Sequence, residues 1–263
     1  MRKLFFVALA MTSMNVAANA ADIPMKALPT AYDWSGFYVG GNIGGVFGRD
    51  ALSSTSTFPA PNAPIDTAAV NAAQTTNLNS SGVIGGLQAG HNWQNGNLLL
   101  GVETDFTVMS LKSSSGGTFV FPSTLPGGPI GPPTQFFTTS NTMSADWLFT
   151  LRPRVGFAMN NWLVYATGGL VVGHEKVNET SVLAAGFTTT NSFSTTAVGW
   201  TVGAGVEYGL NRNWSIKAEY LYVDLGTPLA NSGVLTPTIA GYSSLLTSHL
   251  TMSIARGGVN YRW

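Results

Sequence analysis

The chain has 263 residues, and only 9% of them are charged, with 12 Lys and Arg against 12 Asp and Glu. Soluble domains carry about 25% charged residues, so this composition does not favour a soluble surface. The zero net charge argues against a nucleic-acid partner, and the absence of cysteine excludes disulfides, thiol chemistry and thiolate metal sites.

The N-terminal residues have the features of a secretory signal. Arg2 and Lys3 precede a short apolar run at residues 4–14, and small residues stand before the bond between Ala20 and Ala21. An uncleaved anchor is the alternative, but the run is shorter than the roughly 20 residues of a membrane span. We therefore expect a signal peptide at 1–20, a short periplasmic segment at 21–34 and a β-barrel at 35–263.

Beyond the N-terminal segment, eight stretches alternate apolar and polar residues with a period of two. Each is long enough to cross a membrane as a tilted strand, which takes about 9–11 residues. Because alternate side chains turn to lipid, no single stretch looks continuously hydrophobic. The predicted strands are 36–48, 82–93, 98–111, 147–158, 162–175, 197–209, 214–223 and 250–263.

The connections between these strands alternate between short and long. The short ones, at 94–97, 160–161 and 210–213, contain Asn or Gly, which tolerate the positive φ of tight hairpins. This layout predicts an all-β, eight-stranded, antiparallel up-and-down transmembrane β-barrel with short periplasmic turns and long extracellular loops. The long connections are predicted at 50–79, 113–146, 176–196 and 224–249.

Most charged residues of the strands share one face, which we place inside because a charge facing lipid costs about 2–4 kcal/mol at the membrane midplane. An eight-stranded barrel is narrow enough to be filled by its own side chains. Two interpretations stay open: a structural polar plug, or a gate whose ion pairs exchange partners and admit small ions. The expected interior charge network comprises Glu103, Asp105, Arg152, Arg154, Glu207, Lys217, Glu219, Arg256 and Arg262.

Four tryptophans stand beside the short turns or at the C-terminus, as in a periplasmic aromatic girdle at headgroup level. The core of a soluble β-sandwich is the alternative, but it would not explain why these residues collect at one rim. The girdle residues are Trp93, Trp162, Trp214 and Trp263.

The last strand does not keep a single phase in the sequence. The apolar residues of 250–254 have the opposite parity to those of 259–263. A β-bulge at Arg256–Gly258 would bring both sets to the lipid face, and we predict one there.

Catalysis requires a base and a nucleophile. His174 and His249 are expected near the external rim, but no Gly-x-Ser-x-Gly elbow or His-Glu-x-x-His motif occurs, and the three histidines are scattered. The sequence therefore predicts no enzyme, no catalytic residues, no cofactor and no metal site, although a rim-site hydrolase stays open as a hypothesis. Aromatic segments at 119–121 and 136–137 could contact other molecules or pack on one another.

Seven stretches resemble the alphaproteobacterial outer-membrane immunogenic protein family, small porin-like barrels of the OmpA-like transmembrane type. They cover the strands and most turns, whereas the long loops match nothing, and Trp263 stands where family members more often end in Phe. The resemblance implies a surface-exposed, antigenic protein of the bacterial outer membrane. The stretches are Asp33–Gly44, 85–94, 152–156, 165–169, 199–208, 217–226 and 256–263.

Members of this family are credited variously with envelope integrity, limited permeability and surface or haem binding. We accordingly expect a structural role in the envelope, with a narrow pore for small ions or solutes as a variant. The alternative is a surface binding protein or adhesin that binds a host factor or haem through its loops. Expected partners are outer-membrane lipid and lipopolysaccharide, the barrel-assembly machinery through the C-terminal strand, and a host or small-molecule ligand at the loops.

Overall fold

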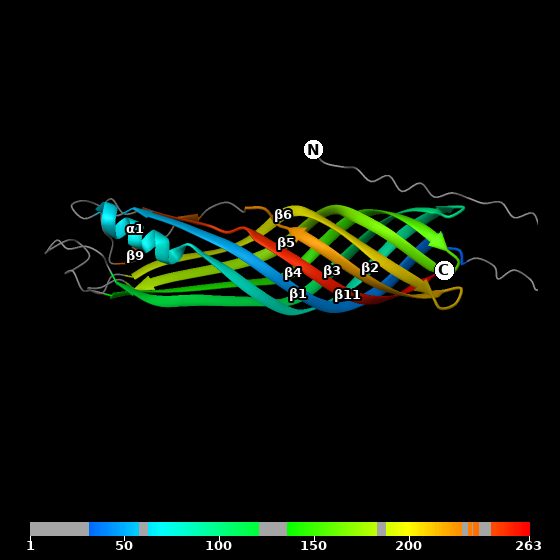
Figure 1. Cartoon of the computed structure of the whole chain (residues 1–263), viewed down its shortest axis with the longest axis horizontal. Coiled ribbons are helices and arrows are strands. Elements are labelled where there is room, and N and C mark those ends of the chain that lie inside the picture. Colours follow the sequence, from blue (N-terminus) through cyan, green and yellow to red (C-terminus); the bar gives the residue numbers. More distant parts are fainter. Residues whose placement is uncertain are drawn as a thin grey trace, which may run out of the picture. The chain divides into compact units, whose positions relative to one another are not determined.

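Eight long strands pair antiparallel in chain order, and the last strand returns to the first, which closes the sheet into a barrel (Figure 1). Side chains alternate between the two faces along every strand, as the period-two pattern predicts. The predicted eight-stranded barrel is therefore confirmed. Its strands are β1 (Gly36–Thr57), β2 (Thr76–Asn95), β3 (Leu98–Val120), β4 (Phe136–Met159), β5 (Trp162–Val182), β6 (Thr188–Gly209), β7 (Trp214–Asp224) and β11 (Leu250–Arg262).

The structure is a computed structural model that describes residues 32–57, 63–120, 136–182, 188–227, 231–232, 234–236 and 243–263. The expected signal peptide at 1–20, its cleavage site between Ala20 and Ala21 and most of the segment 21–34 lie outside the described residues.

Most strands run further than the sequence predicts, so the predicted loop bounds at 50–79, 113–146 and 176–196 are wrong. β1 reaches Thr57 and β3 reaches Val120, because residues 53–57 and 113–118 are all Ser, Thr or Gly and continue the strands without an apolar face to reveal them. The first connection contains α1 (Ala63–Gln74), and the last contains β8 (Asn231–Ser232), β9 (Val234–Thr236) and β10 (Ser243–Thr247). No helix in the described residues is long and apolar enough to cross a membrane.

The predicted bulge at Arg256–Gly258 is wrong, because β11 pairs with β1 in one uninterrupted register from Leu250 to Arg262. The same register continues into β10, where Thr247 lies opposite Ser53. Leu250, Met252 and Ile254 therefore point into the barrel together with Arg256. The phase change in the sequence reflects a change in the interior, which is charged near Arg256 and apolar above it.

The short turns and the C-terminus lie at one end of the barrel, and α1 and β9 lie at the other (Figure 1). Two of the turns use positive φ, with Gly96 at 59° and Asn160 at 52°, as their residue types predict. In outer-membrane barrels the end with short turns faces the periplasm. We refer to this end as the short-turn rim and to the opposite end as the long-loop end.

An apolar band surrounds the barrel from the short-turn rim to a sharp upper boundary. On β1 the outward side chains Val39, Ile43 and Phe47 are exposed and apolar, and the next outward residue is Arg49. On β4 the band ends at Trp147. Beyond this boundary the outward side chains of the described strands are mostly Ser, Thr, Asn and charged residues.

A cysteine-labelling experiment tests the register of β11, since the natural chain offers no cysteine background. We expect Thr251→Cys in the refolded barrel to react with a bulky membrane-impermeant maleimide, because residue 251 faces outward above the apolar band. Met252→Cys should remain unlabelled until the barrel is denatured, because residue 252 is buried inside. The reverse pattern would restore the bulge at Arg256–Gly258.

Candidate functional site

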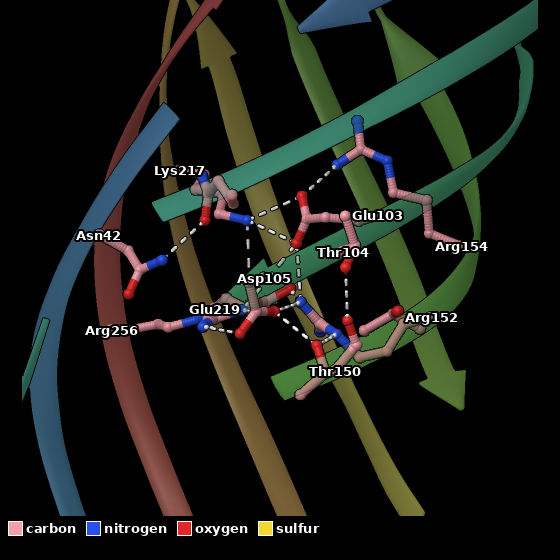
Figure 2. A network of polar contacts seen from close by, with 12 residues as sticks. Asn42, Glu103, Thr104, Asp105, Thr150, Arg152, Arg154, Lys217, Glu219 and Arg256 are labelled. Carbon is pink, nitrogen blue, oxygen red and sulfur yellow. Dashed lines mark hydrogen bonds and ion pairs between the residues drawn. The ribbon is translucent and has the colours of Figure 1, made fainter. Parts of the chain in front are cut away.

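Eight charged side chains meet in the middle of the barrel, and they form what we call the charge network. Figure 2 labels all of them except Glu207. Four are cationic and four are anionic, so the network is balanced without a counterion. Five strands supply them, and none exceeds 5% exposure. The members are Glu103 and Asp105 from β3, Arg152 and Arg154 from β4, Glu207 from β6, Lys217 and Glu219 from β7, and Arg256 from β11.

Glu103 joins opposite walls of the barrel. Its carboxylate accepts hydrogen bonds from Arg152 Nη2 at 2.7 Å and from Lys217 Nζ at 2.9 Å. The hydroxyl of Tyr38 on β1 donates a third at 2.8 Å, and Arg154 Nη1 lies 3.6 Å away. One carboxylate therefore links β1, β3, β4 and β7.

Arg152 is the largest fully buried charged side chain in the described residues, and it binds three carboxylates. Besides Glu103, its guanidinium contacts Asp105 at 2.8 Å and Glu219 at 3.2 Å. Arg256 binds two of the same carboxylates, those of Glu219 at 2.6 Å and Asp105 at 3.0 Å. Figure 2 shows these carboxylates and guanidiniums directed at one another across the interior. Such geometry is needed to offset the cost of removing each charge from water.

Neutral amides surround the network on the side of β1, β2 and β11. Gln88 donates to Asn260 at 2.6 Å and accepts from Asn42 at 3.0 Å. Asn260 in turn donates to Glu207 at 2.8 Å. Glu207 also lies 3.4 Å from Arg154, which attaches it to the remaining charges.

Arg262, the ninth predicted member, faces the interior but lies outside the charge network. Its guanidinium lies over the rings of Tyr32 and Trp34, at 4.5 and 5.1 Å from their centroids, and donates to the backbone oxygen of Asp33. Trp34 is fully buried against Leu99 and neighbouring apolar side chains. The residues just before β1 therefore fill the short-turn rim from inside, which the sequence does not reveal.

On the long-loop side of the charge network, an apolar layer fills the interior. Every strand of the ring contributes to it, and its members are at most 9% exposed. We call this layer the apolar collar and define it by one residue from each strand. These residues are Val46, Ile84, Met109, Leu148, Val171, Ala197, Leu221 and Met252.

Above the collar and beyond the apolar band, two buried carboxyl groups share one hydroxyl. Ser248 Oγ is 2.7 Å from Asp50 and is also hydrogen-bonded to Glu175. A hydroxyl has one hydrogen, so one of the two carboxyl groups must carry a proton to complete both bonds. The pKa of Glu175 is raised to about 7, chiefly by burial and also by the charge of Asp50, while the Ser248 hydrogen bond opposes the shift. The backbone N–H of His249 also donates to Asp50, at 3.1 Å.

The predicted external position of His174 and His249 agrees with the structure. His249 pairs with Asp224 at 3.1 Å. His174 contacts the hydroxyl of Ser194 at 2.9 Å and the carboxylate of Asp146 at 3.4 Å, an order of groups like that of a hydrolase triad. Lys176 binds the same carboxylate more closely, at 2.7 Å, and these side chains are partly exposed, so little of the negative charge of Asp146 acts on His174.

The four girdle tryptophans all point outward at the short-turn rim. Their exposed fractions lie between 45% and 65%. Trp162 packs on Tyr208, with 4.7 Å between ring centroids, and Trp214 packs on Tyr261 at 5.1 Å. At the long-loop end, Phe119 stacks on Phe137 at 5.4 Å, so these aromatic residues pack on one another.

Sequence reasoning missed Ser248, Ser194 and the pair Tyr32 and Trp34. Their partners are distant in sequence, as with Ser248 and Glu175, whose positions differ by 73. Only the aromatic pair carried a usable signal, since two large rings beside the first strand predict burial.

An apolar exterior around an interior of paired charges is the arrangement of a membrane-spanning β-barrel. The chain matches the model of the outer membrane protein beta-barrel domain over residues 5–245. It is 32% identical over 257 residues to a 31 kDa outer-membrane immunogenic protein of Brucella melitensis biotype 1, covering 94% of each chain. The chain therefore belongs to this outer-membrane β-barrel family and resides in the bacterial outer membrane, in contact with membrane lipid.

A second relative is the 22 kDa outer membrane protein of Rhizobium leguminosarum bv. viciae. It is 29% identical over 209 residues, covering 78% of this chain and 69% of the relative. Among solved structures, Neisserial surface protein A aligns with 87% of this chain and 98% of its own, at 14% identity and a TM-score of 0.35. The Brucella and Rhizobium relatives agree with the family that the sequence resembles.

Two ion pairs of equal length give a matched test of burial. We expect Glu103→Gln to lower the free energy of unfolding by about 3–5 kcal/mol, because it leaves buried cations uncompensated. Asp146→Asn breaks a pair that is also 2.7 Å long but half exposed, and should cost no more than about 1 kcal/mol. Urea unfolding in detergent micelles measures the free energy of unfolding of both variants. Equal losses would contradict the conclusion that the buried charge network stabilises the fold more than an exposed ion pair does.

The shared hydroxyl of Ser248 predicts a pH dependence. Glu175 has a raised pKa in the folded state, so the unfolded chain releases its proton first and stability falls as pH rises from about 4.5 to about 7. The loss from this group is roughly 3 kcal/mol. Glu175→Gln cannot titrate, so its unfolding free energy should fall less over this range and exceed that of the natural chain at pH 8. Parallel pH profiles would refute the assignment.

Proposed function

We propose that this protein is a sealed structural barrel of the outer membrane that contributes to envelope integrity. The observation that carries the proposal is the sequence of three filled layers along the interior. Trp34 and its neighbours fill the short-turn rim, the charge network fills the middle, and the apolar collar lies above it. A water-filled path would have to cross all three.

The variant with a narrow, gated pore requires ion pairs that exchange partners. Arg152 and Glu103 are each bound by several partners, so moving one of them separates more than one opposite-charge contact in a low-dielectric interior. Even if those contacts exchanged, Leu148 and Leu221 of the apolar collar would oppose the passage of hydrated ions. The layered interior thus favours the sealed form over the pore.

Surface binding or adhesion remains the second candidate function. It is favoured by the polar strands that extend beyond the apolar band and by exposed apolar side chains on them. Phe136 is 61% exposed and Val120 is 54% exposed. Single exposed apolar residues are common on proteins, so this observation supports the candidate less strongly than the filled interior supports the sealed barrel.

We also propose that the protein is not an enzyme, because the contacts of His174 are dominated by an exposed ion pair between Asp146 and Lys176. Assembly is proposed to proceed through the barrel-assembly machinery, which would engage the C-terminal strand β11. The exposed aromatic Trp263 directly follows that strand, which presents outward residues to lipid along one uninterrupted register.

Conductance tests the sealed barrel directly. We expect the refolded chain to show no discrete current steps in planar bilayers. The paired variant Glu103→Ala with Lys217→Ala should be equally silent, because it keeps the remaining charges balanced and leaves the collar intact. In cells, loss of the protein should raise sensitivity to detergent, and expression of either form should restore resistance.

Insertion must be verified by the compact mobility of the unheated barrel on gels, so that silence is not mistaken for failed folding. Discrete steps in the natural chain, altered by the paired variant, would instead establish a narrow pore lined by the interior charges. Unchanged detergent sensitivity in the deleted strain would refute the envelope role.

A further inference from the structure

A row of polar side chains crosses three strands just above the apolar band. Lys112 on β3 lies directly opposite Ser144 on β4, which lies directly opposite Lys176 on β5. All three point out of the barrel. Because direct cross-strand neighbours are about 5 Å apart, the two lysines stand about 10 Å apart with a hydroxyl between them.

A surface hollow of about 420 Å³ lies beside this row. The pairing registers of β3 and β4 shift next to it, between Val108 and Leu111 and between Ala145 and Trp147. Such irregularities bend and twist a strand locally, which accounts for a hollow on an otherwise even wall. The residues that line it are Lys112, Ser113, Ser114, Thr142, Met143, Ser144 and Asn178.

The cations at this level are available to a ligand. Lys112 forms no ion pair among the described residues. Lys176 uses one N–H on Asp146 at 2.7 Å, which leaves two further donors on its ammonium group. Arg49 on β1 adds a third outward cation above the band. Hydroxyl and amide groups supply the remaining donors around the hollow.

The same three strands present a flat apolar surface immediately below the row. Phe106 stacks on Trp147, with 5.9 Å between centroids and an interplanar angle of 25°. Trp147 is nearly parallel to His174, at 6.2 Å and 5°. Donors for an anion above and aromatic faces below match a molecule that joins a charged headgroup to acyl chains.

The opposite arc of the barrel differs at this level. On β6, β7 and β11 the described outward residues at the boundary include Thr196, Asp224 and Thr251, with no Lys or Arg among them. The cationic character is therefore confined to the arc from β1 to β5 rather than spread around the barrel. A ligand attracted only by the overall charge of the surface would not require the cations to lie on one side of the barrel.

We propose that the hollow on β3, β4 and β5 binds the phosphate group of a phosphorylated lipid in the outer leaflet. Lys112, which lines the hollow, and Lys176, which lies beside it opposite Ser144, provide the charge, and Ser144 and Thr142 provide hydroxyl donors to the phosphate oxygens. The acyl chains of the same lipid lie against Phe106 and Trp147. A free phosphate would lack this second contact, so the lipid is the occupant that uses both parts of the surface.

The test titrates the refolded full-length barrel in detergent with bisphosphorylated lipid A and with the same lipid after removal of its phosphates. Lysine-to-alanine changes at 112 and 176 together should weaken binding of the phosphorylated lipid about tenfold or more. Arg212→Ala is the matched control, because it removes an exposed cation at the short-turn rim and should leave binding unchanged. Native mass spectrometry counts the bound lipid.

Several results would overturn the proposal. Equal affinity for the dephosphorylated lipid would mean that the phosphate does not contribute to binding. Equal weakening by Arg212→Ala would mean that binding depends on the overall charge of the protein and not on this hollow. Displacement of the lipid by inorganic phosphate at comparable concentration would assign the hollow to a free anion. If the double variant fails to reach the compact gel mobility, Lys112→Gln alone is titrated, and unchanged affinity there would also refute the site.

Discussion

The structure depends on eight charges being held out of water in the middle of a narrow barrel. Each of the four cations of the charge network lies beside carboxylates from other strands, and Arg152 alone reaches three of them. A one-residue slip of any contributing strand would turn its charge toward lipid and leave its partners unpaired. The network therefore fixes the register of five strands at once, which matters more than the net energy of any one ion pair.

The layers on either side give this network its strength. The apolar collar and the buried Trp34 limit access of water from both ends, and charge pairs interact more strongly where water is excluded. Arg262 shows the same logic at the short-turn rim, where two aromatic rings and a backbone oxygen take the place of a carboxylate. The charged side chains of the interior are thus paired with opposite charges or stacked on aromatic rings, in the manner of a protein core.

The membrane-crossing part of the fold was predictable because the lipid imposes a strict contrast between the two faces of a strand. Where that contrast ends, prediction failed. Residues 53–57 are Ser or Thr on both faces, so nothing in them distinguishes strand from loop. On β11 this contrast gave a wrong prediction, because the apolar side chains of Met252 and Ile254 pack inside the barrel and do not face lipid. The charged members of the site could be named from sequence, but not their pairings, which depend on which strands face each other across the barrel.

The outer face of the barrel changes character at the outer boundary of the band. Below the boundary the outward side chains are apolar; above it the cations Arg49, Lys112 and Lys176 face outward, while the interior holds both apolar side chains such as Leu52 and polar ones such as Ser54. Just above this boundary Asp50 and Glu175 are buried without a cation beside them among the described residues, and both are hydrogen-bonded to Ser248. One oxygen of each of these two carboxyl groups, Oδ2 of Asp50 and Oε2 of Glu175, is buried without a hydrogen-bond partner among the described residues. Because side chains fill the interior along the membrane, the proposed lipid site uses the outer surface above the band and not the inside of the barrel.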